Sequence, residues 1–171
     1  LYAALKIDEW GVKNNMYMVP SSEFYFVAWG ALPIKHPVIV LPTAGWLARG
    51  FVNEVSTGAV IIGDPEFGNT MPQLPGARLE ALSVAALYGV EALIGVNATI
   101  AAVRERAANG IFLLHLATHG IFDEVNPMHS AVILSDGKQA KPLTAASIFE
   151  NPIRAGLIVL SACDTGVGRP V

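Results

Sequence analysis

The chain has 171 residues, of which 53% are hydrophobic and only 15% are charged. This length suits one domain with a substantial core, and so many apolar residues exclude an intrinsically disordered chain. A formal net charge of −3 excludes a protein that binds nucleic acid through a basic surface. The longest stretch without a charged side chain, from Arg106 to Asp123, holds 16 residues between them. A membrane-spanning helix needs about 20 such residues, so we expect no membrane segment.

Cys163 is the only cysteine, which excludes an internal disulfide and a cysteine-rich metal site. A reducing compartment suits such a chain, and no secretory leader is visible at its start, so we expect a cytoplasmic protein. We also expect no cofactor and no metal. The chain begins without Met and stops at Val171, eight residues after Cys163. We therefore expect it to be a piece of a longer protein.

Short apolar runs that end at turn residues alternate along the chain with segments of helical periodicity. Leu79, Leu82, Ala86 and Leu87 recur at three- and four-residue spacings, which predicts a helix with these residues on its core face. Asn97 and Thr144 are the expected N-caps of two later helices. In chain order we expect strands at 38–41 and 59–62, helices at 77–88 and 98–108, strands at 111–116 and 131–134, a helix at 143–149 and a strand at 156–163.

This order of elements predicts an α/β domain. Strands that are apolar throughout are typical of a mostly parallel sheet buried on both faces by helices. We expect residues 1–171 to form a single domain, in which an irregular aromatic segment, 1–36, precedes an α/β core, 37–171. Ligands of such sheets bind beyond the carboxyl ends of the strands.

Two reactive side chains follow predicted strands at that end. His119 comes after the strand at 111–116 and is followed by Gly120, and Cys163 ends the strand at 156–163. We expect the strands at 111–116 and 156–162 to be adjacent and parallel, with the imidazole about 4–7 Å from the sulfur, close enough to act as its general base. The backbone N–H groups of Gly120 and Cys163 are then candidates for stabilising an oxyanion.

Other interpretations of these residues involve no catalysis. A cysteine or a histidine at the end of a buried strand is often only a core residue. His115 and His119 would share one face of an extended strand, and Cys163 could join them as a third zinc ligand. No fourth ligand is evident. The glycines at 63 and 68 have the spacing of a phosphate-binding loop without its lysine. Arg78 and Glu80 are expected to be solvated helix charges.

Several blocks of the sequence, in order, resemble the CHAT domain, a caspase- and separase-like cysteine peptidase domain often joined to TPR repeats. The resemblance covers residues 60–168, and its most specific blocks are His-Leu-Ala-Thr-His-Gly at 115–120 and Leu-Ser-Ala-Cys-Asp-Thr-Gly at 160–166. The remaining blocks are 62–65, 74–81, 95 with 98–99, 130 with 134, and 143–144 with 148.

The resemblance implies a caspase-like three-layer sandwich with a mostly parallel central sheet, incomplete at the C-terminus of this chain. It implies a cysteine endopeptidase that hydrolyses peptide bonds, with His119 as the base and Cys163 as the nucleophile. The implied partners are a protein or peptide substrate and, on the full-length chain, TPR or other regulatory domains. The alternatives are a catalytically inactive caspase-like scaffold, a regulatory interaction module, or a flavodoxin-like ligand-binding domain in which Cys163 is a core residue.

Overall fold

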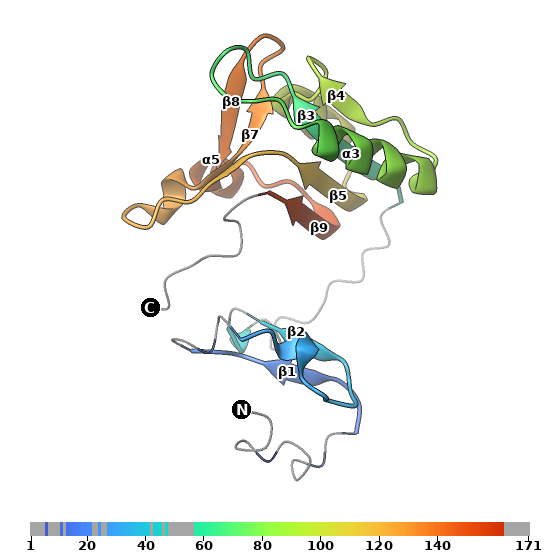
Figure 1. The fold of residues 1–171 in the computed structure, drawn as a ribbon, viewed down its shortest axis with the longest axis vertical. Helices are drawn as coiled ribbons and strands as arrows, with labels where there is room; N and C mark the ends of the chain where they lie inside the picture. The colour runs from blue at the N-terminus through green and yellow to red at the C-terminus, as the bar shows by residue number, and fades with distance from the viewer. Residues whose placement is uncertain are drawn as a thin grey trace. The chain divides into compact units, whose positions relative to one another are not determined.

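The computed structural model describes residues 6, 11, 13–21, 24, 27–41, 43–45, 47 and 57–162. The chain divides into two compact units, the first within residues 1–52 and the second within residues 53–168 (Figure 1). Each unit is described on its own below. In the described part of the chain, no helix is both long enough and apolar enough to cross a membrane.

The first unit contains a small parallel sheet of two strands, β1 (Met16–Met18) and β2 (Val38–Val40), and a short 3-10 helix, η3 (Trp29–Ala31). Trp29 is buried, and its indole N–H donates to the carbonyl oxygen of Phe24 at 3.0 Å. We expected the strand at 38–41 to be buried in the α/β core. That expectation is wrong, because β2 pairs with β1 and leaves Val40 48% exposed.

The second unit is built on a parallel sheet of four strands. Their order is β4 (Leu93–Gly95), β3 (Ala59–Pro65), β5 (Ile111–Ala117) and β9 (Ala155–Ser161), and every neighbouring pair is parallel. The expected α/β class with a mostly parallel central sheet is therefore confirmed, and the arrangement is consistent with a caspase-like sandwich. The expected adjacency of strands 111–116 and 156–162 is confirmed by the pairing of β5 with β9.

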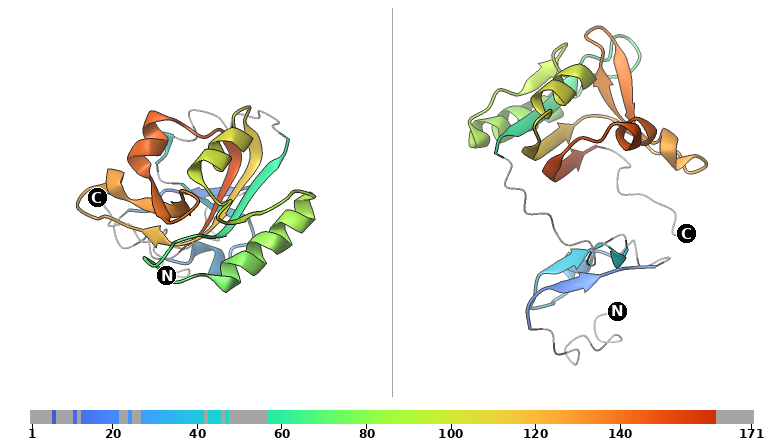
Figure 2. Two further views of the ribbon diagram at one scale, coloured as in Figure 1. Left: turned by 90° about the horizontal axis from the view of Figure 1, so that it is seen from above. Right: turned by 180° about the vertical axis from the view of Figure 1, so that it is seen from behind.

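One face of this sheet is covered by α3 (Pro75–Tyr88), which lies along it in Figure 2. The predicted helix is confirmed, but its predicted core face is wrong. Leu79, Leu82 and Leu87 are 67%, 49% and 85% exposed, whereas Ala81 and Ala85 are buried against the sheet. The reason is a close approach at Gly63 of β3, where an added Cβ would lie 2.3 Å from the Ala81 Cβ. Only small side chains fit between a helix and a strand at that distance.

The opposite face is covered by α4 (Ile100–Arg106) and by a three-stranded antiparallel sheet. That sheet consists of β6 (Gly120–Ile121), β7 (Ala131–Ser135) and β8 (Ala140–Thr144), and α5 (Ala145–Glu150) follows it. A short 3-10 helix, η4 (Pro127–His129), links β6 to β7. Side chains of β3, β5, α4, β7 and β8 form one apolar core here.

Two boundaries differ from the expected elements on this face. The predicted helix at 143–149 begins only at Ala145, because residues 140–144 pair with β7 as β8. The expected cap at Thr144 is confirmed, since its hydroxyl accepts from Ser147 N at 3.1 Å. The expected cap at Asn97 is wrong, because the side chain of Thr99 accepts from Ala102 N at 3.0 Å and begins α4 two residues later.

Candidate functional site

The carboxyl ends of β5 and β9 bring together the segments that lead to His119 and to Cys163. Ala117 pairs with Ser161, and Thr118 N then donates to Ser161 O at 3.2 Å, which extends the ladder beyond β5. Every pair between the two strands joins residues 44 positions apart. His119 and Cys163 are also 44 positions apart in the sequence. Cys163 itself lies outside the described residues.

His119 leaves β5 through a firmly anchored backbone. Thr118 is buried, and its hydroxyl donates to the carbonyl oxygen of Ile133 in β7. Ile133 N donates in return to the carbonyl oxygen of His119 at 2.9 Å. After His119 the chain turns from the parallel sheet into β6, and His119 itself is only partly buried.

The imidazole of His119 is oriented by two contacts from the segment between β3 and α3. Its Nε2 lies 2.9 Å from the carbonyl oxygen of Pro72, and its ring packs on Phe67, with centroids 4.9 Å apart. A carbonyl oxygen only accepts hydrogen bonds, so Nε2 carries the proton. In the neutral ring, Nδ1 is then the nitrogen with the free lone pair. The nitrogen able to accept a proton is thereby assigned to Nδ1.

Gly120 begins β6 beside this histidine. It faces Val132 across the antiparallel pair, next to the hydrogen bond that Ile133 N donates to His119 O. In an antiparallel ladder, bonded pairs alternate with pairs whose N–H groups point outward. The Gly120 N–H therefore points away from β7, on the side of β6 where no described strand pairs.

The segment that carries Pro72 and Phe67 is held by Asp64, the last residue but one of β3, which has a positive φ of 45° and is 2% exposed. Its carboxylate accepts from Leu74 N at 2.6 Å and from the Arg78 Nε at 3.0 Å. Both bonds fix the start of α3, so Asp64 sets the path of the chain that presents the Pro72 carbonyl to His119.

Sequence reasoning missed a polar cluster beneath this end of the sheet. Glu80 of α3 places Oε1 2.9 Å from Nε2 of His115 in β5, and its Oε2 accepts from Ser161 Oγ of β9 at 3.0 Å. The expectation of solvated helix charges is confirmed only in part: the side chains of Arg78 and Glu80 are 47% and 39% exposed, but Arg78 binds the buried Asp64 and Glu80 binds a buried histidine. A histidine inside an apolar strand needs a partner, and that was the signal available in the sequence.

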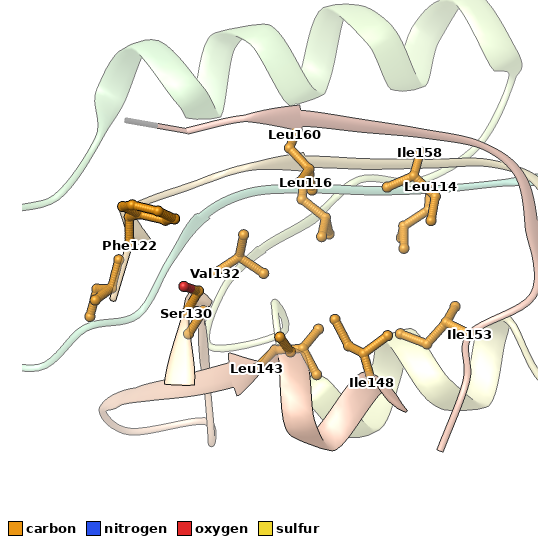
Figure 3. A pocket seen from close by; sticks show the side chains of 13 residues that line it. Leu114, Leu116, Phe122, Ser130, Val132, Leu143, Ile148, Ile153, Ile158 and Leu160 are labelled. Carbon is orange, nitrogen blue, oxygen red and sulfur yellow. The ribbon is translucent and has the colours of Figure 1, made fainter. Parts of the chain in front are cut away.

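An apolar hollow lies on the sheet face opposite α3 (Figure 3). Leu114 and Leu116 of β5 and Ile158 and Leu160 of β9 line it from one side. Leu143 of β8, Ile148 of α5 and Ile153 after α5 line it from the other. Among its described lining residues, the hydroxyl of Ser130 is the one group that could donate or accept a proton through its side chain. This hollow therefore offers hydrophobic contact but no acid, base or strong nucleophile.

The family model of the CHAT domain matches residues 19–171, which is most of the chain. No curated protein sequence matches it.

Proposed function

The chain belongs to the CHAT domain family of caspase-like, peptidase-related domains, and from that premise we propose that it is a cysteine endopeptidase. In this proposal Cys163 is the nucleophile, His119 is the general base, and the substrate is a protein or peptide. The observation that carries the proposal is the strand register. The offset of 44 residues between β5 and β9 equals the separation of His119 and Cys163, so both follow their last paired residue by two positions.

The orientation of His119 supports the direction of proton transfer. Nδ1 takes the proton from the Cys163 thiol, and the thiolate attacks the carbonyl carbon of the peptide bond. The Nε2–H stays bonded to the Pro72 carbonyl, which favours the imidazolium that forms. That imidazolium then gives the proton from Nδ1 to the departing amine, and a thioester remains on Cys163.

The second half of the reaction uses the same groups. Nδ1 takes a proton from water, the resulting hydroxide attacks the thioester, and the thiol is restored as the acid product leaves. In both halves the tetrahedral intermediate carries a negative oxygen, which the N–H groups of Gly120 and Cys163 stabilise. The outward direction of the Gly120 N–H supports this role.

The proposal also covers the cellular compartment and the partner domains of the protein. A single free thiol is kept reduced most readily in the cytosol, which supports a cytoplasmic site of action. On the full-length chain, TPR or other regulatory domains are the proposed partners that control access to the site.

The test is covalent labelling by a peptide chloromethyl ketone, followed by mass spectrometry. Cys163 is the only cysteine, so a modified thiol identifies it directly. We expect labelling of the unmodified chain and a loss of about 10²–10⁴-fold in rate for His119→Ala. His129→Ala is the matched control, because His129 is exposed and bonds only with Asn126 and Asp123 among the described residues. Labelling that is absent, or that is indifferent to His119, would favour a catalytically inactive scaffold.

A further inference from the structure

The polar cluster of Glu80, His115 and Ser161 joins three elements that are far apart in the sequence. Its carboxylate extends from α3 and reaches β5 through His115 and β9 through Ser161, at 2.9 and 3.0 Å. A carboxylate only accepts, so His115 Nε2 carries a proton and Ser161 donates its hydroxyl hydrogen. His115 is 5% exposed, so the bond to Glu80 satisfies a group that water does not reach.

The surroundings of this cluster are apolar. The same face of the sheet buries Ile61 and Leu113 against Ala81 and Ala85 of α3. Burying the His115 imidazole there costs desolvation free energy, which its hydrogen bond to the partly exposed Glu80 carboxylate only partly offsets. Apolar side chains at these positions would avoid that cost. The cluster therefore calls for an explanation beyond core packing.

The position of the polar cluster beside the last strand of the sheet provides an explanation. β9 is the last strand in the order of its sheet and pairs only with β5 among the described strands. Leu157, Ile158 and Leu160 are each about half exposed, so packing holds the strand weakly. The ties at its carboxyl end include the ladder bond from Thr118 N and the side-chain bond from Ser161 to Glu80.

We propose that Glu80 and Ser161 are positioning residues, which hold the end of β9 against β5 and α3 so that the chain leaving Ser161 presents the Cys163 thiol to His119. This inference rests on the proposed function. Ser161 precedes Cys163 by two residues, and His115 precedes His119 by four. The cluster thus anchors both strands just before their reactive residues. A slip of one residue at this end would turn the following side chains to the opposite face of the sheet.

The test measures the rate at which iodoacetamide alkylates Cys163 as a function of pH, because the thiolate is the form that reacts. Ser161→Ala removes the bond to Glu80, Ser161→Thr keeps a hydroxyl, and Ser83→Ala removes a serine hydroxyl from the exposed surface of α3 as a control. For Ser161→Ala we expect a loss of about tenfold in rate at pH 7, since small displacements of reacting groups have large effects. We also expect its pH profile to move toward the ordinary thiol pKa of about 8.5. Ser161→Thr and Ser83→Ala should keep the original profile.

Substitutions at Glu80 separate geometry from charge, and they replace the serine variants if Ser161→Ala does not fold. Glu80→Gln can still accept from Ser161, and its amide can donate to His115 Nε2 when the imidazole takes the Nδ1–H tautomer, so it should keep most of the rate. If Glu80 positions the thiol, Glu80→Ala should move the pH profile of alkylation to higher pH. If Glu80 acted only through its charge, the same substitution would move the profile to lower pH, because a nearby negative charge disfavours the thiolate.

The proposed Cys–His dyad and the proposed positioning role are refuted by different results. If His119→Ala shifts the profile and neither Ser161→Ala nor Glu80→Ala does, the positioning role is refuted and the dyad stands. If these variants lower only the urea midpoint and leave the profile unchanged, the cluster is purely structural. If His119→Ala itself leaves the profile unchanged, both the dyad and the positioning role are refuted.

Discussion

Replacing Gly63 by alanine should destabilise the second unit by about 1–3 kcal/mol, the usual cost of overpacking a core. A Cβ at this position would lie 2.3 Å from the Ala81 Cβ and 2.6 Å from the Ala77 carbonyl oxygen. Ordinary contacts are 3.4–4 Å, so α3 would have to move away from β3 by about 1 Å or more. Neither obstructing atom belongs to a flexible side chain, and therefore no rotamer change can relieve the contact.

The displacement should also reach the polar cluster, because Glu80 lies on α3 between Ala77 and Ala81 and is bonded to His115 at 2.9 Å. Urea unfolding followed by circular dichroism measures the loss of stability. Gly76→Ala is the matched control: its Cβ would meet no atom within 4 Å, and alanine is the better helix former by up to about 1 kcal/mol. The double variant Gly63→Ala with Ala81→Gly should recover part of the loss. Equal urea midpoints for Gly63→Ala and Gly76→Ala would refute the packing argument.

Further predictions concern caps, a buried carboxylate, pH and metals. Thr99→Ala should cost about 1 kcal/mol in urea unfolding, because the first turn of α4 loses its side-chain acceptor. Asp64→Ala should cost about 1–3 kcal/mol in the same assay, because the N–H of Leu74 loses its partner. The backbone N–H groups of Gln139 and Lys138 lower the pKa of Asp136 below 3.8, so Asp136→Ala should be less stable at neutral pH. That difference should disappear as the pH falls through the lowered pKa, because a depressed carboxyl pKa stabilises the fold only above it. Addition of EDTA should leave peptide ketone labelling of Cys163 unchanged, and a loss of labelling would contradict the metal-free mechanism.

Much of the second unit follows from local pattern. The runs at 59–62, 111–116, 131–134 and 156–161 are apolar without alternation, which predicts strands, and the first three are mostly buried in their sheets while the last forms the half-exposed β9. The parallel arrangement of β3, β5 and β9 follows because helices or other long connections separate these strands, whereas β7 pairs antiparallel with β6 and β8. The cap at Thr144 was also predictable, since it depends on residues only three apart. The likeness of the two specific blocks to the CHAT domain agrees with the family match.

The orientation of α3 was decided by tertiary structure. Its leucines are spaced like a core face, yet its alanines are buried, because Gly63 lets the helix approach the sheet more closely than leucine side chains allow. Periodicity describes one element alone and carries no information on the shape of the surface it meets. The assignment of residues 140–144 to β8 has the same cause, since pairing with β7 outweighs the helical pattern there.

The polar contacts of the candidate site were likewise decided by the tertiary structure. Glu80 meets a histidine 35 residues away and a serine 81 residues away, and His119 meets a carbonyl oxygen 47 residues away. The sequence alone determined that two reactive residues follow two apolar strands, because strand formation is governed by near neighbours. Which nitrogen of His119 is free, and what anchors the end of β9, depend on contacts between elements that only the assembled sheet and helix bring within hydrogen-bond distance.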